Sequence, residues 1–183
     1  KGPFKGLVLD LRNNPGGLLN AAVGVSGAFI PKDALVVYTE GRAQDSKMHL
    51  TATPENYLKG GGKDDYLKDF PEDIRSTPMA VLVNNGSASA SEIVAGALQD
   101  HKRAFIVGMK RFGKGTVQSV LDLSRFVRSE KENPGVLKIT LEKFYRITGS
   151  STQHKGVSPD FALPSAFSAE EFGESSQPSA LPW

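Results

Sequence analysis

The residues best suited to chemistry lie in two loops made of small residues. The first, residues 86–92, reads GSASASE and lies between an expected buried strand and an expected helix. Its small side chains would let a substrate backbone approach closely, and a helix N-terminus offers unpaired N–H groups that stabilise an oxyanion. A serine in such a strand–turn–helix element is well placed to attack a carbonyl carbon. Spacing alone does not choose among Ser87, Ser89 and Ser91.

The same loop also has a purely structural interpretation. Ser89 followed three residues later by Glu92 matches the capping box S-x-x-E, in which a serine and a glutamate satisfy the free N–H groups at a helix start. On this interpretation Ser89 only caps a helix, and the small residues only permit close packing. The segment by itself leaves both interpretations open.

The second loop, residues 112–116, reads FGKGT and places Lys114 between two glycines. A lysine can act as general base for a serine only when its amine is neutral. Because an ordinary lysine has a pKa of about 10.4, a lysine base needs an environment that lowers its pKa by about 2–3 units. Burial beneath an apolar wall has this effect, and Phe112 is a neighbouring apolar side chain. The ordinary alternative is a solvated lysine in a glycine turn.

A nucleotide-binding loop is the rival chemical interpretation of this segment. Gly108, four further residues and then Gly113-Lys114 nearly match the Walker A pattern G-x-x-x-x-G-K-[ST], but Gly115 stands where a serine or threonine should bind magnesium. A Walker loop also opens a helix, whereas residues 116–120, TVQSV, alternate like a strand. Nucleotide binding is therefore disfavoured.

Composition excludes several other kinds of site. The 183 residues contain no cysteine, which removes disulfides, thiolate metal sites and a cysteine nucleophile. His49, His101 and His154 are far apart in the sequence and far from the serine loop, so neither a zinc site nor a Ser–His–Asp triad finds support. The net charge of +2 gives no reason to expect nucleic acid as a partner. No apolar run approaches the roughly 20 residues that span a bilayer.

The hydrophobic pattern predicts an α/β layered core that would position both loops. Expected strands cover residues 6–11, 35–39, 79–83, 104–107, 116–123 and 136–145, and expected helices cover residues 18–29 and 91–98. Residues 40–77 are polar and are interpreted as a surface excursion that allows short strands and is not expected to hold the chemistry, and residues 150–159 are interpreted as a polar turn. The loops at 12–17 and 84–91 both follow strand C-termini, where active sites gather in open α/β sheets.

Four blocks in this order resemble the C-terminal processing peptidases, also called tail-specific proteases. They are residues 7–17 (LVLDLRNNPGG), 86–93 (GSASASEI) continuing to Gln99-Asp100, 112–118 (FGKGTVQ), and a weaker block of 143–146 (KFYR) with 151–160. The resemblance runs from about residue 6 to residue 164. It implies a crotonase-like (Clp protease-like) α/β core with additional strands, no cofactor, and a serine endopeptidase activity that works through a Ser–Lys dyad and an acyl-enzyme.

The resemblance also implies roles for particular residues. The family's nucleophile is the middle serine, 25 residues before the lysine, which selects Ser89 with Lys114 as its base. Gln118, four residues after the lysine, would help to orient it. The oxyanion hole would use the N–H groups of Ala90 and Gly17.

Two further residues would have supporting roles, Gly16 in the glycine loop and Asp100, which matches an aspartate 11 residues after the serine in some members. A carboxylate close to a lysine favours the charged amine and opposes a base role. A structural role for Asp100 is therefore an equal expectation.

The chain also departs from the family pattern. Many members have an acidic residue and a threonine before F-G-K-G, whereas this chain has Lys110 and Arg111 near that point, where their charge would disfavour a further cation or tune which tails bind. The family's upstream PDZ domain, which recognises substrate C-termini, has no counterpart here. Residues 1–164 are therefore expected to be an excised catalytic core and residues 165–183 a linker or tail toward a missing C-terminal region.

The implied partners are protein or peptide substrates with accessible apolar C-terminal tails. The implied location is the periplasm or another exported compartment, and any membrane association would come from regions outside this chain. The alternative function is an inactive peptide-binding or scaffold module of the same fold, because a sequence can retain Ser89 and Lys114 without aligning them.

Overall fold

The computed structural model describes residues 4–43, 46–58, 64–109, 112–126, 134–164 and 173–182. Two features discussed above lie outside the described residues: the pair Lys110 and Arg111, and the first part of the expected tail, residues 165–172.

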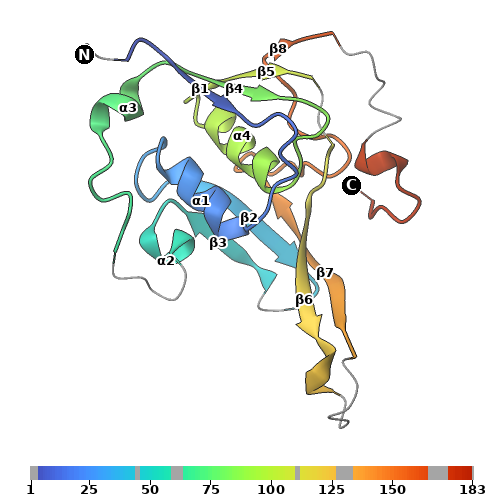
Figure 1. The fold of residues 1–183 in the computed structure, drawn as a ribbon. Coiled ribbons are helices and arrows are strands. Elements are labelled where there is room, and N and C mark those ends of the chain that lie inside the picture. The colour runs from blue at the N-terminus through green and yellow to red at the C-terminus, as the bar shows by residue number, and fades with distance from the viewer. Residues whose placement is uncertain are drawn as a thin grey trace.

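A parallel sheet with strand order β1-β4-β5-β8 forms one layer of the molecule (Figure 1). Its strands are β1 (Leu7–Asp10), β4 (Met79–Val83), β5 (Phe105–Gly108) and β8 (Phe161–Ala162). β4 has the central, mostly buried pattern of a strand rich in valine and leucine. The register pairs Asp10 of β1 with Leu82 of β4, so the two strands end side by side. The loops that follow them therefore begin at the same edge of the sheet.

Two helices form the middle layer. Helix α1 (Leu19–Gly27) follows the glycine loop, and helix α4 (Ala90–Asp100) follows the serine loop. Nine successive residues of α4, from Ala90 to Leu98, are buried, because the helix contacts α1, β5 of the parallel sheet and β2 of the second sheet. A helix that is buried all round needs small and apolar residues on every side, which α4 has.

An antiparallel sheet with strand order β3-β2-β7-β6 forms the third layer. Its strands are β2 (Leu35–Gly41), β3 (Met48–Thr51), β6 (Thr116–Asp122) and β7 (Val136–Tyr145). Strands β6 and β7 extend beyond the other two as a ribbon that projects from the body (Figure 1). The layers confirm the predicted α/β class, and six predicted strands and two predicted helices lie within one or two residues of their observed bounds.

The differences from the prediction are short elements. Helices α2 (Pro54–Tyr57) and α3 (Glu72–Ser76) lie in the polar excursion, and β8 adds a two-residue edge strand to the parallel sheet. Two 3₁₀ turns cover Leu123–Arg125 and Glu174–Ser176. Elements this short carry too little periodicity to be predicted from hydrophobic pattern. None of the described helices is long and apolar enough to cross a membrane.

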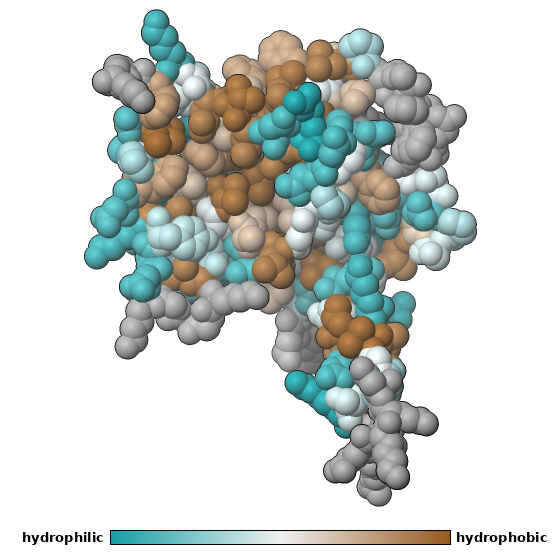
Figure 2. Space-filling view, viewed as in Figure 1, coloured by the Kyte–Doolittle hydropathy of each residue, from teal (hydrophilic) through white to brown (hydrophobic). Residues whose placement is uncertain are grey.

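Large apolar side chains are exposed on two parts of the surface near the parallel sheet. Val8 of β1, Phe105 of β5 and Phe161 of β8 lie on the parallel sheet, and Leu18 and Val25 lie at and on α1. Figure 2 shows hydrophobic side chains gathered over β1 and α1.

Candidate active site

The structure separates the three serines of the first loop by what each hydroxyl contacts. Ser87 Oγ is buried and donates to Leu11 O at 2.7 Å, and Ser91 Oγ, also buried, donates to Asn14 O at 3.0 Å. Both hydroxyls therefore fasten the serine loop to the loop after β1. Ser89 is the one of the three that stays partly exposed.

Ser89 also has an unusual backbone conformation. It stands immediately before α4 with φ 55° and ψ −116°. A residue with a side chain at positive φ costs on the order of 1–3 kcal/mol, and such strain concentrates at functional sites. The sharp turn lets the chain pass from β4 directly into α4 and leaves Ser89 at the end of the sheet, as in other strand–turn–helix elements.

The loop after β1 packs directly against the serine loop. Ala88 N donates to Asn14 O at 3.1 Å, and Asn13 and Asn84 exchange two hydrogen bonds of 2.9 and 2.8 Å. Gly16, at φ 92°, lies so close that a Cβ there would be 2.6 Å from Ala88 O and 2.7 Å from Ala90 N. A glycine is therefore required at residue 16 both by conformation and by space.

The two glycines of this loop differ in whether their N–H groups already have an acceptor. Gly16 N already donates to Asn14 Oδ1 at 3.0 Å. The N–H groups of Gly17 and Ala90 donate to no other residue in the described part of the chain. Both are thus available to a ligand, and both line one small cavity.

Substitution of Gly16 by alanine is expected to lower the free energy of unfolding by about 2–4 kcal/mol, because left-handed backbone strain adds to the clash with Ala88 and Ala90. Gly135→Ala is the matched control: its φ is 81°, but a Cβ there meets nothing within 4 Å, so about 1–2 kcal/mol is expected. Urea denaturation measures both. Equal losses would show that the two loops are not tightly packed.

One buried carboxylate joins the serine loop to the lysine loop. Glu92 is fully buried, and its Oε2 accepts hydrogen bonds from Ser89 N and from Lys114 N, each at 2.9 Å. Its Oε1 accepts a third from Gly113 N at 3.1 Å. The contact with Ser89 N is the capping contact that the sequence pattern predicted, whereas the contacts 21 and 22 residues away had no sequence signal.

The side chain of Lys114 is held by the second sheet. Lys114 Nζ donates to Gln118 Oε1 at 3.0 Å, and Gln118 Nε2 donates to Thr140 Oγ1 of β7 at 3.2 Å. Across the described residues, the hydrogen bond of this amine goes to Gln118 and not to Ser89 Oγ. Catalytic hydrogen bonds in unliganded enzymes are often long and tighten only with substrate. The structure thus brings Ser89, Lys114 and Gln118 into one region, with Glu92 as the shared backbone anchor.

Asp100 lies at the other end of α4 from Ser89. Eleven helical residues at 1.5 Å each place the two about 16 Å apart. Asp100 is nearly buried and forms an ion pair with Arg146, which also donates to Gln99 Oε1 at 2.9 Å. These contacts give Asp100 a structural explanation, as the fastening between α4 and the segment after β7.

The segment at residues 173–182 forms a wall beside Lys114. Glu174 N donates to Phe112 O at 2.7 Å, and the buried Gln153 donates through Nε2 to Leu181 O at 2.8 Å while its Oε1 accepts from Gly115 N at 2.7 Å. A cavity of about 200 Å³ lies between this segment and the side chains of Lys114, Gln118 and Thr140. The polar composition of the segment gave no indication of this position.

An ion pair holds the start of the glycine loop. Arg12 donates to both carboxylate oxygens of Asp10, at 2.9 Å from Nε and 2.7 Å from Nη2. These hydrogen bonds lower the pKa of Asp10 to about 2. A carboxylate with a lowered pKa favours the folded state above its ordinary range and loses that effect as the pH falls. The Asp10 carboxyl is therefore ionised throughout the pH range in which proteins are usually assayed.

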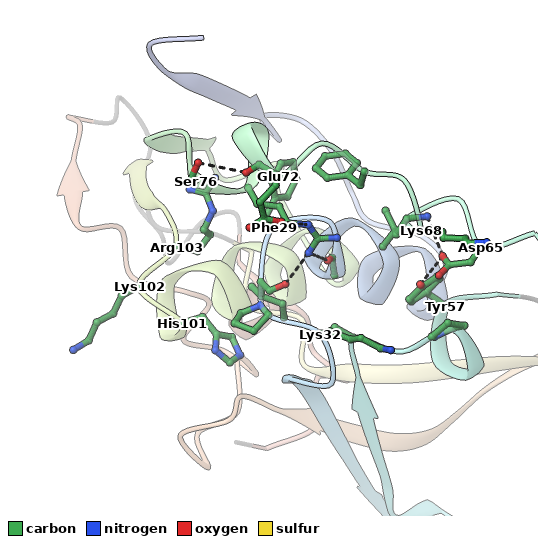
Figure 3. Close-up of a pocket in the computed structure, with 18 residues that line it drawn as sticks. Phe29, Lys32, Tyr57, Asp65, Lys68, Glu72, Ser76, His101, Lys102 and Arg103 are labelled. Atoms are coloured by element: carbon green, nitrogen blue, oxygen red, sulfur yellow. Dashed lines mark hydrogen bonds and ion pairs between the residues drawn. The ribbon is translucent and has the colours of Figure 1, made fainter. Parts of the chain in front are cut away.

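A larger cavity, of about 840 Å³, lies away from the serine loop (Figure 3). It is bounded by α3 and by the C-terminal end of α4, where His101, Lys102 and Arg103 follow the helix. Arg75 Nη1 donates to Gly27 O and Ile30 O at 3.3 Å, and Arg103 Nη2 donates to Thr77 O at 2.8 Å. Each arginine therefore joins two segments that are distant in the sequence. Within the described ranges, no group of three or more His, Cys, Asp or Glu side chains could hold a metal ion.

Sequence comparison relates the chain to peptidases. Residues 1–163 match peptidase family S41. The tail-specific protease of Haemophilus influenzae is 39% identical over 177 residues, which cover 97% of this chain and 23% of that protein. The carboxy-terminal-processing protease of Bartonella bacilliformis is 44% identical over 160 residues, 87% of this chain and 31% of that protein. The chain thus spans about a quarter to a third of these relatives' length.

Solved structures support the same relationship. The photosystem II D1 C-terminal processing protease matches with a TM-score of 0.63 and 35% identity, over 87% of this chain and 34% of that chain. Mature CPAF matches with a TM-score of 0.61 at 18% identity, over 92% of this chain and 40% of that chain, which supports the fold alone. The layered core is that of these proteases, as the resemblance implied.

Proposed function

Because this chain belongs to peptidase family S41, we propose that it is the catalytic core of a serine endopeptidase with Ser89 as nucleophile and Lys114 as general base. The observation that carries the proposal is the Glu92 carboxylate, which binds the backbone of both residues at 2.9 Å. Two loops 25 residues apart in sequence are thereby fixed to one anchor.

The proposed reaction gives each of these residues one role. Ser89 Oγ attacks the carbonyl carbon of the substrate while the neutral amine of Lys114 takes the hydroxyl proton. The oxyanion that forms accepts hydrogen bonds from the free N–H groups of Ala90 and Gly17. Collapse expels the amine of the cut bond, which receives the proton from Lys114, and leaves an acyl-enzyme. Lys114 then takes a proton from the water that attacks the ester, and it returns this proton to Ser89 Oγ when the second tetrahedral intermediate collapses, which frees the serine.

Gln118 is a positioning residue in this mechanism. Its neutral amide oxygen holds Lys114 Nζ at 3.0 Å, and Thr140 fixes the amide in turn. A carboxylate in this place would favour the charged amine, whereas an amide orients the lysine with less effect on its charge. Asp100 is proposed to be structural, through its ion pair with Arg146.

The substrates proposed are protein chains with accessible apolar C-terminal tails. The supporting observation is that the relatives include a tail-specific protease and carboxy-terminal-processing proteases. An exported or organellar compartment is proposed as the site of action, and a chloroplastic C-terminal processing peptidase of Tetradesmus obliquus, 38% identical over 158 residues, is consistent with it.

Digestion of casein tests the proposed activity. The full-length polypeptide that contains these residues is incubated with casein in water enriched in ¹⁸O, and the products are analysed by mass spectrometry. New C-termini that carry ¹⁸O are expected, because water opens the acyl-enzyme. A parallel sample with Ser89→Ala controls for contaminating proteases. Casein that is bound but stays intact would support the inactive peptide-binding module instead.

A further inference from the structure

The lysine loop, residues 112–116, is held from two sides. From α4, Glu92 accepts hydrogen bonds from Gly113 N at 3.1 Å and from Lys114 N at 2.9 Å. On the other side, the fully buried Gln153 accepts from Gly115 N through Oε1 at 2.7 Å. Three successive N–H groups of the loop are therefore bound by two buried side chains, and both side chains determine where the lysine backbone lies.

The carbonyl groups of the loop are bound as well. His154 N donates to Gly113 O at 2.7 Å, and Phe144 N donates to Gly115 O at 2.9 Å. The packing is also close, because a Cβ on Gly115 would lie 2.6 Å from Gln153 N. In an interior packed this closely, a shift on the Gln153 side is expected to displace the backbone that carries the lysine.

Gln153 has a second contact, with the segment at residues 173–182. Its Nε2 donates to Leu181 O at 2.8 Å and to Glu174 Oε1 at 3.5 Å. The amide thus uses its acceptor on the lysine loop and its donors on the segment. An amide is a neutral group that can accept at one atom and donate at the other. One buried side chain therefore makes the positions of the loop and the segment depend on each other.

The segment at residues 173–182 lies beside the start of β6 and is mostly exposed (Figure 1). Besides its contacts with Gln153, it is attached where Glu174 N donates to Phe112 O at 2.7 Å and where Lys143 Nζ donates to Pro182 O. An exposed element that is held by a few polar contacts opens at a lower cost than a core strand. Because Phe112 belongs to the lysine loop, opening of the segment would release the loop at two points.

We propose that Gln153 is a positioning residue for Lys114, and that it makes the alignment of this base depend on the segment at residues 173–182. The inference rests on the proposed function, since it takes Lys114 as the general base. With the segment in place, the amide holds Gly115 N while Lys114 Nζ donates to Gln118. When the segment is displaced, the amide loses its partner there and holds the loop less firmly. The rate constant kcat then falls, and KM changes much less.

Gln153→Glu tests the role of the amide, because its effect should depend on pH. A protonated carboxyl donates at one oxygen and accepts at the other, so it replaces both contacts of the amide. An ionised carboxylate only accepts, and it would face Leu181 O and the Glu174 carboxylate without a donor. The variant should therefore align the base while the introduced carboxyl is protonated and lose that ability as the pH rises through its pKa.

The neighbouring titratable groups set the direction in which that pKa moves. Glu174 on the segment and Glu92 on α4 disfavour a second carboxylate. Lys114, Lys143 of β7 and a charged His154 favour it. Burial adds to the effect of Glu174, whose oxygen lies 3.5 Å from the amide nitrogen, so the pKa of the introduced carboxyl is expected to lie above its ordinary value.

Casein cleavage by the full-length polypeptide that contains these residues measures the effect. At each pH, kcat of Gln153→Glu is divided by kcat of the unsubstituted protein, which cancels the titration of Lys114. The temperature is one at which circular dichroism shows both proteins folded. The ratio should be close to one in acid and fall about tenfold or more as the pH rises, with KM changing much less.

Gln99→Glu is the matched control. The Gln99 amide also donates to a carbonyl and to a carboxylate, at 2.9 Å to Ser158 O and at 2.8 Å to Asp160 Oδ1, but it lies at the far end of α4 from Ser89. This substitution should affect stability in the same way, because the new carboxylate faces Asp160. Its kcat ratio should stay the same at every pH, because the lysine loop is not disturbed.

The dependence on the segment is tested at Glu174, which also keeps the inference testable if Gln153→Glu fails to fold. Glu174→Pro removes the N–H that binds Phe112 O, at the first residue of a 3₁₀ turn, where the ring of proline is tolerated. Glu174→Ala removes the side chain and keeps the N–H. The proline variant should have a kcat about fivefold or more below that of the alanine variant.

The outcomes separate this inference from the proposed function. A ratio for Gln153→Glu that does not change with pH, or equal kcat for the two Glu174 variants, would overturn this inference while cutting still depends on Ser89 and Lys114. Cutting that survives Ser89→Ala or Lys114→Ala at the full rate would overturn the proposed function and this inference with it.

Discussion

Replacement of Lys114 by alanine is expected to reduce peptide-bond cleavage by at least about a thousandfold, as far as Ser89→Ala reduces it. General acid–base catalysis contributes about 10²–10⁴ in rate, and residues that act as one unit each cost nearly the whole effect when removed. Lys114 would serve four proton transfers in one turnover, so its loss cannot be offset at a single step. Initial rates of casein and peptide cleavage measure the effect.

Two controls separate a base from a structural cation. Lys114→Arg keeps the positive charge, but a guanidinium is not deprotonated in proteins, so this variant should be as inactive as Lys114→Ala. Gln118→Ala removes the hydrogen bond to Lys114 Nζ without removing the base, so kcat should fall by a smaller factor, about tenfold, with little change in KM. An active Lys114→Arg protein would show that this lysine acts through its charge alone.

Periodicity predicted the elements that position these residues because their packing is local and regular. The valine- and leucine-rich β4 and the small residues of α4 lie in the middle of a layered core, where a buried strand and a buried helix have strong patterns. Those two elements and β1 fix where the serine and glycine loops lie. The α/β class and the meeting of these loops at one sheet edge could therefore be predicted.

The contacts that distinguish the serines could not be predicted from the sequence. Ser87 and Ser91 bond to carbonyls more than seventy residues away, on the loop after β1, and Ser89 differs from them in backbone conformation and exposure. The spacing of residues in the sequence does not predict hydrogen bonds between residues so far apart. The family resemblance chose Ser89 instead, and in the structure Ser89 is the partly exposed serine of the three, with a side chain that belongs to the capping box of α4.

The position of residues 173–182 beside Lys114 could not be predicted from the sequence for a related reason. Residues 173–182 have the polar composition of a linker, and they are placed by a few specific hydrogen bonds, such as that from Gln153 to Leu181 O, rather than by an apolar face. Gln153 is fully buried and also accepts from Gly115 N, so one side chain connects this segment to the lysine loop. A buried glutamine is recognisable only once its partners are known.

Replacement of Glu92 by glutamine is expected to lower the free energy of unfolding by about 3–5 kcal/mol. The carboxylate accepts from two N–H groups at one oxygen and from a third at the other, and the Glu92 side chain itself is fully buried. An amide replaces one acceptor oxygen with an NH₂ donor, which then faces at least one backbone N–H. Since whole domains are stable by about 5–15 kcal/mol, the loss is a large part of the total.

Glu72→Gln is the matched control, because the Glu72 side chain is 86% exposed and its 3.6 Å ion pair with Arg75 lies on the surface. Such a pair contributes about 0–1 kcal/mol, so thermal and urea unfolding should scarcely change. If the two variants lose equal stability, the Glu92 carboxylate is not the anchor that its contacts indicate.

If Glu92 positions the dyad, its substitution should lower kcat even in a protein that is still folded. A purely structural role predicts no such loss. At a temperature where circular dichroism shows Glu92→Gln fully folded, kcat should still fall about tenfold or more, with KM changing much less, because Ser89 and Lys114 no longer share one acceptor. The Gly113–Lys114 backbone would then shift relative to the serine loop, and a displacement of about 1 Å costs about a hundredfold in rate. A folded Glu92→Gln protein with unchanged kcat would make Glu92 a core residue with no part in aligning the dyad.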